Sequence, residues 1–233
     1  MPSTWSLSFD PLLDSSRLRV ALVWASGLPG CPKTTAASAY LADLLGSVKA
    51  AGEAFLPPER KTAVRDMLRH GKYKPAGRAK PSSEYLLAAA LEGHFPLVNG
   101  PVDANNAVSL EWGYPASVFD AAKTGADLLV RRGRAGESYV FNPSGQTIEL
   151  EDLLVVCRRV RAAGSTDDGW EACGNPVKDA MATKVFEDAR EVVAVVYAPA
   201  SGGAERLGAC ASRFRDLLEK ECGAAEAGFS IFP

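Results

Sequence analysis

The segment at residues 191–199, EVVAVVYAP, constrains the fold of this chain more than any other segment. It is β-branched and apolar almost throughout, and it does not alternate between apolar and polar positions. A strand with one face in water would alternate, so a continuous apolar run indicates a strand that is covered on both faces. We therefore expect residues 191–199 to form a central strand of a sheet.

Helical and strand patterns divide the rest of the chain into two parts. Apolar residues recur at helical spacing in the first half, whereas short runs between turn residues dominate from residue 126 onward. A further buried strand is expected at 17–28, closed by Gly-Leu-Pro-Gly. The expected helices are 31–52, 57–71, 81–94, roughly 103–112 and 203–222. The expected short strands are 126–133, 137–143, 146–150 and 153–160, and the polar, Gly-rich residues 161–176 are expected to form a long loop.

This order of elements predicts an α+β fold. Helices come first, then meandering strands, and then one strand followed by a helix, which differs from the regular alternation of βαβ units. We expect a single domain over residues 1–233, with helices packed on a mixed or antiparallel sheet. A chain of 233 residues can bury a sizeable core without disulfides or a structural metal.

The composition argues against several classes of protein. Hydrophobic residues make up 47% and charged residues 23%, which is typical of a globular protein in solution, and the net charge of −2 gives no general attraction to nucleic acid. No segment approaches the ~18 apolar residues of a membrane span, and the start lacks a secretory signal. The odd number of cysteines, without a C-x-x-C motif, favours a reducing cytoplasm. Only His70 and His94 are present, so we expect neither a metal site nor a cofactor.

A cluster of basic residues precedes the third expected helix. Residues 59–80 contain eight lysines and arginines but only two acidic residues, Glu59 and Asp66. Beside a helix N-terminus, such a cluster would hold phosphate groups of a nucleic acid. The alternative is a solvated charged face next to an ordinary capped helix, and the sequence leaves it open. The candidate phosphate-binding residues are Lys74, Arg78, Lys80, Ser82 and Ser83.

Signals for familiar catalytic groups are weak. The chain has no G-x-S-x-G motif, and Cys173 has no base placed near it in the sequence, so we interpret Cys173 as structural and assign no catalytic residue. Segments 131–138 and 142–146 contain glycine, but no nucleotide-binding fingerprint surrounds them. We interpret both segments as hairpin turns.

The stretch at 102–120, VDANNAVSLEWGYPASVFD, places polar residues at the start of an apolar helix. Asp103 is expected to be the N-cap residue of a helix that begins at Ala104. Asn105 and Asn106 then fall in the first turn, where short polar side chains are tolerated. Two further amides would each need a partner if buried, so they are also candidates for holding a small polar ligand.

Residues 97–139 resemble the B3/B4 domain of the phenylalanyl-tRNA synthetase beta subunit. That domain carries the pattern V-D-x-T-N-x-V-x-L-E-x-G-Q-P-x-H-x-F-D, followed by a short apolar V-R and a G-E. The likeness extends over about 70–230, as in free-standing forms of the domain, so 71–233 is the best-matched part and 1–70 an N-terminal strand-helix portion. The positions that keep the pattern are Val102, Asp103, Asn106, Val108, Leu110, Glu111, Gly113, Pro115, Phe119 and Asp120.

The resemblance implies an editing role. In the synthetase the domain binds the 3′ end of a tRNA wrongly charged with tyrosine and hydrolyses the ester. The family's Thr-Asn pair falls on Asn105 and Asn106, its histidine on Ser117, and the segment that reads the tyrosine hydroxyl near Asn175. These four residues are the candidate ligand pocket. Because Ser117 replaces the histidine and the family glutamate has no clear counterpart, the chemistry or the amino-acid preference must differ.

Three functions follow as hypotheses. The first is a cytoplasmic protein that binds aminoacyl-tRNA and hydrolyses mischarged forms in trans. The second is a non-catalytic binder of tRNA, aminoacyl-tRNA or an amino acid-like metabolite, which the missing histidine and glutamate favour. The third is transfer of the aminoacyl group to a small acceptor. Ligase activity is not implied, because nothing resembles the catalytic core of the synthetase.

Overall fold

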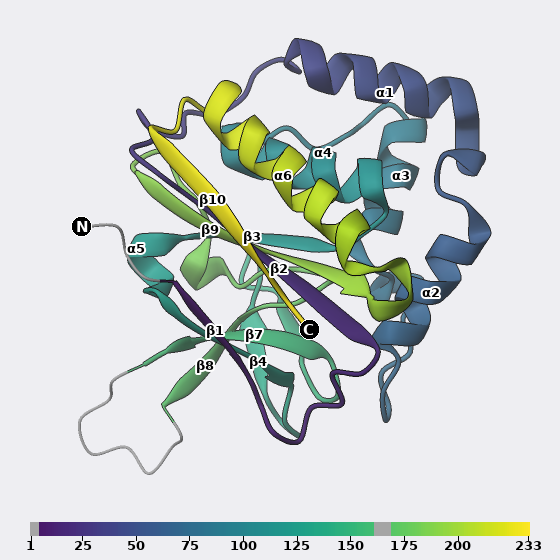
Figure 1. The fold of residues 1–233 in the computed structure, drawn as a ribbon, viewed down its shortest axis with the longest axis vertical. Helices are drawn as coiled ribbons and strands as arrows, with labels where there is room; N and C mark the ends of the chain where they lie inside the picture. The colour runs from purple at the N-terminus through teal and green to yellow at the C-terminus, as the bar shows by residue number, and fades with distance from the viewer. Residues whose placement is uncertain (1–4, 161–168) are drawn as a thin grey trace.

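The computed structural model describes residues 5–160 and 169–233 and confirms the central position of 191–199. Strand β9 (Glu191–Pro199) lies between β2 (Leu18–Ser26) and β3 (Ala116–Asp120), and β10 (Glu226–Phe232) completes an antiparallel sheet of order β10-β2-β9-β3 (Figure 1). Residues 192–198 are at most 1% exposed. The absence of polar alternation in the sequence therefore reflects burial on both faces.

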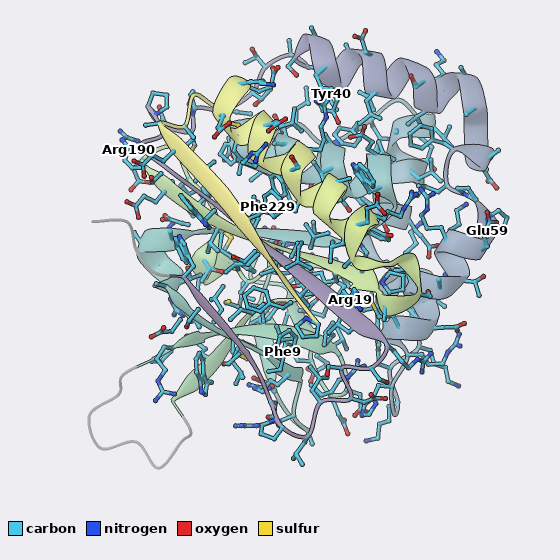
Figure 2. The ribbon with its side chains drawn as sticks, in the orientation of Figure 1. Phe9, Arg19, Tyr40, Glu59, Arg190 and Phe229 are labelled. Atoms are coloured by element: carbon cyan, nitrogen blue, oxygen red, sulfur yellow. The ribbon has the colours of Figure 1, made fainter. Side chains whose placement is uncertain are left out.

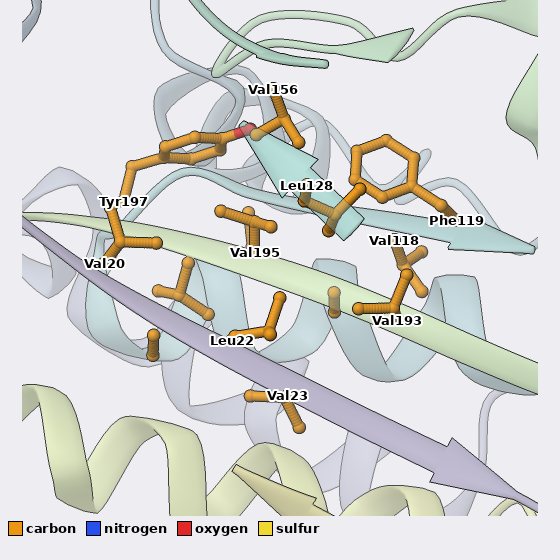
Figure 3. Close-up of a cluster of buried hydrophobic side chains, with 14 of the residues drawn as sticks. Val20, Leu22, Val23, Val118, Phe119, Leu128, Val156, Val193, Val195 and Tyr197 are labelled. Atoms are coloured by element: carbon orange, nitrogen blue, oxygen red, sulfur yellow. The ribbon is translucent and has the colours of Figure 1, made fainter. Parts of the chain in front are cut away.

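The two faces of β9 are covered by different layers. Helices α4 (Gly100–Trp112) and α6 (Ala204–Lys220) cover one face of this sheet: α4 packs on β3 and β9, and α6 packs on β2 and β10 (Figure 1). Phe229 of β10 is labelled in Figure 2, and the guanidinium carbon of Arg215 in α6 lies 5.7 Å from its ring centre. On the other face, Val195 and Tyr197 point toward Leu128 and Val156 of a second sheet (Figure 3). One hydrophobic core thus joins both sheets.

The second sheet is mixed, which confirms the predicted fold class. Its strands are β1 (Ser6–Phe9), β4 (Asp127–Arg132), β7 (Leu154–Arg159) and β8 (Trp170–Gly174), in the order β1-β4-β7-β8. The β1–β4 pair is parallel, and the other pairs are antiparallel. Strands β5 (Ser138–Val140) and β6 (Thr147–Glu149) form a separate two-stranded hairpin.

The expected helices are all present. The remaining helices are α1 (Ala39–Ala51), α2 (Pro58–Leu68), α3 (Ser82–Leu91) and the short α5 (Ala121–Thr124). Helix α1 begins after Ser38, whose hydroxyl accepts from the Leu41 amide, so it is shorter than the predicted 31–52. Helices α1, α3 and α4 share a second apolar cluster.

The prediction that Asp103 is the N-cap of α4 is wrong. The helix begins at Gly100, and the side chain of Asn99 caps it by accepting from the Val102 amide at 3.2 Å. Asn99 and Pro101 together outcompete Asp103, because proline suits the first turn of a helix. Asp103 instead accepts from the Val98 amide at 2.7 Å, which fixes the chain just before the helix.

Two loop predictions also need correction. The loop expected at 161–176 contains β8 at its end, while residues 161–168 lie outside the described part of the chain. The segment 142–146 is a hairpin turn between β5 and β6, as predicted, but 131–138 is not. It leads from β4 into β5, which pair in different sheets, so it is a turn that connects two sheets.

In the described ranges, 5–160 and 169–233, no helix has the length and apolarity that crossing a membrane requires.

Candidate functional site

A cavity of about 590 Å³ opens between α3, α4, the edge of β3 and the segment 175–187. The segment 96–99, which connects α3 to α4, closes one side. The walls are largely apolar, and the size suits a small organic ligand or part of a larger one. Apolar side chains that line the cavity include Leu86, Leu97, Val102, Val118, Val177, Met181 and Val185.

Three residues that line this cavity each carry a buried polar atom that lacks a hydrogen-bond partner among the described residues: Ser82 Oγ, Asn105 Oδ1 and Asp179 Oδ1. Buried polar atoms are nearly always paired, because an unpaired one costs the free energy of its lost hydration. The three atoms come from α3, α4 and the segment after β8, which are far apart in sequence. Polar residues from separate segments thus lie in the wall of one largely apolar cavity, which is typical of a ligand-binding site.

The side-chain nitrogen of Asn105 is hydrogen-bonded to its surroundings. Its Nδ2 donates to the backbone oxygen of Ala116 at 3.3 Å and to Asn106 Oδ1 at 3.4 Å. The Ala116 oxygen can only accept, so the opposite orientation of the amide would bring two oxygens together. Asn105 is 5% exposed, and its Oδ1 is buried without a hydrogen-bond partner among the described residues.

Asp179 is a site residue that the sequence analysis did not identify. Burial raises the pKa of this carboxyl from 3.8 to about 7, while the Ser117 hydroxyl, the Lys184 ammonium and the backbone amides of Val118 and Asn175 oppose the rise. The carboxyl therefore titrates near neutral pH. The only signal in the sequence was an acidic residue in the segment GNPVKDAMAT.

Asn175 lines the cavity, but its side chain serves the fold of the loop. Its Oδ1 accepts from the backbone amides of Val177 and Lys178 at 2.8 and 2.9 Å, and its Nδ2 donates to the Tyr139 hydroxyl at 2.6 Å. This arrangement is an Asx turn, which fixes the chain direction after β8. Asn175 thereby positions the segment that carries Asp179.

Ser117 lies behind the cavity, on the buried side of β3. It is 0% exposed, and its hydroxyl donates to the backbone oxygen of Asn175 at 3.4 Å and lies 3.1 Å from the Tyr197 hydroxyl. Asn105, Asn106 and Asn175 are therefore brought together at the cavity, whereas Ser117 supports its wall from within.

Of the candidate phosphate-binding residues, only Ser82 lines the cavity. Lys74 and Arg78 are exposed and Lys80 is half-buried, on the segment that leads into α3. Ser82 lines the cavity, but Ser83 faces the core at 1% exposure. Several other basic residues of the cluster are paired with acidic ones: Arg65 with Glu84, Arg69 with Asp66 and Lys72 with Glu151.

The mouth of the cavity combines exposed apolar groups with positive charge. Tyr85, Val98 and Phe186 are among the most exposed large hydrophobic side chains described, and all three line the cavity. Lys33 and Lys178 line it as well. Aromatic faces beside lysines are the elements that bind single-stranded nucleic acid.

Cys173 lies at the end of β8 and has no access to solvent. It is 1% exposed, and burial raises the pKa of its thiol well above the ordinary value. A buried, protonated thiol is a poor nucleophile, which agrees with its interpretation as a structural residue.

The B3/4 domain family matches residues 74–201 of this chain, which is more than half of its length. The matched range includes α3, α4, β3 and the segment with Asp179, which provide most of the cavity wall. The chain therefore belongs to the B3/4 domain family, and the resemblance seen in residues 97–139 is confirmed.

Two curated relatives are beta subunits of phenylalanine–tRNA ligase. The protein from Bartonella quintana is 31% identical over 98 residues, which cover 41% of this chain and 12% of the relative. The protein from Corynebacterium glutamicum is 39% identical over 66 residues, which cover 28% of this chain and 8% of the relative. The matches thus span about a tenth of the length of these relatives.

Among solved structures, an N-terminal fragment of the phenylalanyl-tRNA synthetase beta subunit from Pyrococcus horikoshii is similar with a TM-score of 0.49 and 10% sequence identity. The similarity covers 99% of this chain and 56% of that chain.

Proposed function

We propose that this protein binds the charged 3′ end of a tRNA and hydrolyses mischarged aminoacyl esters in trans, in the cytoplasm. The observation that carries the proposal is one largely apolar cavity, lined mostly by residues of the B3/4 segment, whose wall contains the polar residues Ser82, Asn105, Asn106 and Asp179. An aminoacyl group offers the donors and acceptors that such residues need.

The approach to the cavity supports a tRNA ligand. Lys74, Arg78 and Lys80 lie on the segment that precedes Ser82 along the chain, and we expect them to contact phosphates of the acceptor end. Tyr85, at 51% exposure, offers a face on which the terminal base can stack. The aminoacyl group would then enter the cavity, because it is attached to that terminal nucleotide.

Hydrolysis at this site would depend on positioning more than on a side-chain nucleophile. The cavity lining contains no histidine among the described residues, and Cys31 in it has a thiol whose pKa is raised by burial. A water molecule held beside the ester, with the neighbouring ribose hydroxyl, would react because orientation alone contributes up to several kcal/mol.

The functional unit proposed here takes in the whole chain. The family match begins at residue 74, yet β2 at Leu18–Ser26 pairs with β9 along its entire length. The N-terminal segment therefore completes the sheet whose other edge forms the cavity. We propose that residues 1–233 act as one B3/4-like domain.

A non-catalytic binder is the second candidate. The residue that replaces the family histidine, Ser117, is buried and hydrogen-bonded to other groups, so it cannot reach a substrate in the cavity. This observation favours recognition without turnover. Such a protein would bind aminoacyl-tRNA or an amino acid-like metabolite, with Asn105 and Asn106 as the ligand contacts.

One measurement distinguishes the two candidates: the rate of ester hydrolysis in a full panel of correctly charged and mischarged aminoacyl-tRNAs. We expect at least one mischarged species to be hydrolysed, and Asn106→Ala to slow that hydrolysis about tenfold. Ser47→Ala, an exposed change on α1, is the matched control and should leave the rate unchanged. Saturable binding of aminoacyl-tRNA without ester loss in the whole panel would establish the non-catalytic candidate.

A further inference from the structure

Strand β10 forms one edge of the first sheet, and in the described part of the chain only β2 pairs with it. None of its residues is buried. The residues after Glu226, AGFSIF, include no charged residue and no proline. Natural edge strands usually carry lysine, proline or a covering segment, because an open edge pairs with other chains. The outer side of β10, away from β2, is therefore a candidate surface for strand pairing.

The register of the sheet shows which backbone groups point to this outer side. The Tyr197 amide donates to a backbone oxygen just before β3, so this residue of β9 directs its backbone groups toward β3. Because successive residues direct these groups to alternate edges, Val196 directs its own toward Ala21 of β2. By the same alternation, Leu22 directs its groups toward its partner Ser230 in β10. The residues of β10 whose backbone groups point outward are thus Ala227, Phe229 and Ile231.

A second copy of this chain fits the outer side of β10. With a two-fold axis at Phe229, the backbone groups of Phe229 exchange hydrogen bonds with those of Phe229 in the second copy, and Ala227 exchanges them with Ile231. The same residues supply both halves of the contact, which is the property of a two-fold interface. The rings of the two copies of Phe229 then form a directly opposed cross-strand pair, an arrangement that stabilises antiparallel strands.

The position of helix α6 leaves room for this arrangement. The helix packs on both β2 and β10 (Figure 1), so it lies about half a strand spacing inside β10 and about 5 Å from the two-fold axis. The two copies of α6 would then be about 10 Å apart, which is the spacing of packed helices. Pairing of the strands therefore also brings the helices into contact.

The charges of α6 beside the axis are compatible with a second copy. The guanidinium carbon of Arg215 lies 5.7 Å from the ring centre of Phe229, so Arg215 is close to the axis. Its guanidinium is paired with the carboxylate of Asp216 at 2.6 Å. This part of the helix surface thus carries one charge of each sign, and two copies meet there without net repulsion.

We propose that this protein forms a two-fold symmetric dimer in which β10 pairs antiparallel with β10 of a second copy. The two four-stranded sheets would then form one continuous sheet. The cavity lies at the opposite edge of the sheet, beside β3, so each copy keeps its cavity accessible. The dimer is independent of the proposed function.

Light scattering on the intact chain after size-exclusion chromatography tests the association. We expect the wild-type protein to have twice the mass of one chain, and Phe229→Lys to have the mass of one chain, because it places two positive charges face to face at the axis. Tyr85→Lys is the matched control, since this exposed aromatic residue lines the cavity, and it should remain a dimer. A wild-type protein with the mass of one chain from 1 to 100 µM would overturn the inference and leave the edge to a strand of another protein. A dimer that persists in Phe229→Lys uses another surface and also overturns it.

A proline substitution tests the backbone pairing itself. Ala227→Pro removes an outward N–H and leaves the hydrogen bonds to β2 in place, whereas Ala227→Ser keeps that N–H. We expect circular dichroism to show that both variants are folded, and only the proline variant to have the mass of one chain. If both variants remain dimers, the strands do not pair and the inference is wrong.

Amide hydrogen exchange of the wild-type protein decides the question without any variant. In the dimer, the outward amides of Ala227, Phe229 and Ile231 should exchange within about tenfold of the rates of Gly228 and Ser230, whose groups face β2. If the outward amides exchange more than tenfold faster than these neighbours at 100 µM protein, the outer side of β10 is open to water and the inference is wrong.

Discussion

The hydroxyl of Ser117 lies 3.1 Å from the hydroxyl of Tyr197, on the side of β3 that faces away from solvent. Each group is fully buried, and each satisfies part of the other's hydrogen-bonding capacity. The pair joins β3 to β9 directly behind the cavity wall. Its role is therefore to hold the wall in place, and contact with a ligand would require it to leave the core.

Ser117→Ala should reduce stability more than it reduces binding. The change leaves the Tyr197 hydroxyl without this partner, and a broken buried hydrogen bond costs about 1–3 kcal/mol. Ser109→Ala is the matched control, because Ser109 is also fully buried but its hydroxyl has no partner among the described residues. We expect the control to be neutral or slightly stabilising in urea denaturation. Equal losses in both variants would contradict the role assigned to the Ser117–Tyr197 pair.

Asp179 should make the protein less stable as the pH rises. Its folded pKa of about 7 lies above the ordinary 3.8, so between these values the folded state binds more protons than the unfolded state. The free energy of unfolding therefore falls by about 4 kcal/mol in total as the pH rises from about 4 to about 7. Above that pH, Asp179 causes no further loss of stability. The titratable groups that face Asp179 are Lys184, Tyr139, Tyr197 and Cys173.

Denaturation of Asp179→Asn across pH 4 to 8 checks this expectation. The pKa values of Tyr139, Tyr197 and Cys173 are raised by burial, so these groups stay neutral over the range. The variant should therefore lack most of the pH-dependent loss and be more stable than the wild-type protein at pH 8. If both proteins show the same dependence on pH, the carboxyl stays ionised at all these values and the raised pKa of Asp179 is wrong.

The sequence predicted the elements whose patterns arise from burial of apolar side chains. Strand β9 was evident because every residue from 192 to 198 is buried, whereas β10 was missed because it is a half-buried edge strand interrupted by Gly228. That glycine is required by packing, since a Cβ there would lie 2.5 Å from the ring of Trp24. A contact between distant strands cannot be read from local propensity.

The candidate site was only partly predictable for a similar reason. Asn105 and Asn106 were identified because two amides in an apolar helix need partners. Asp179 was not identified, since its raised pKa depends on burial beside Val118 of a strand that the sequence pattern did not indicate. Strand β3 itself was missed because its buried Ser117 and Asp120 resemble solvent-facing residues until their tertiary partners are known.

Asn175→Ala should destabilise the protein and displace the segment of the cavity wall that carries Asp179. Its Oδ1 accepts from two backbone amides, so alanine leaves both without this partner, at a cost of about 1–2 kcal/mol. Asn142→Ala is the control, because Asn142 Oδ1 also accepts a backbone amide but lies in the exposed hairpin turn. We expect the control to lose less than about 0.5 kcal/mol. A loss at Asn175 no larger than at Asn142 in urea denaturation would show that the Asx turn does not position the Asp179 segment.

Arg78→Ala and Lys80→Ala should weaken tRNA binding in a way that depends on salt. Each phosphate contact that is removed should lower the slope of log K against log salt by about 0.7 to 0.9, because fewer counterions are released on binding. Fluorescence titrations of a tRNA that carries no amino acid, between 50 and 200 mM salt, measure this slope. Lys49→Ala removes an exposed charge from α1, outside the matched residues 74–201 of the chain, and should leave the slope unchanged. If all three variants shift the slope equally, the protein binds tRNA through diffuse charge, and the phosphate-binding role of the segment before α3 is wrong.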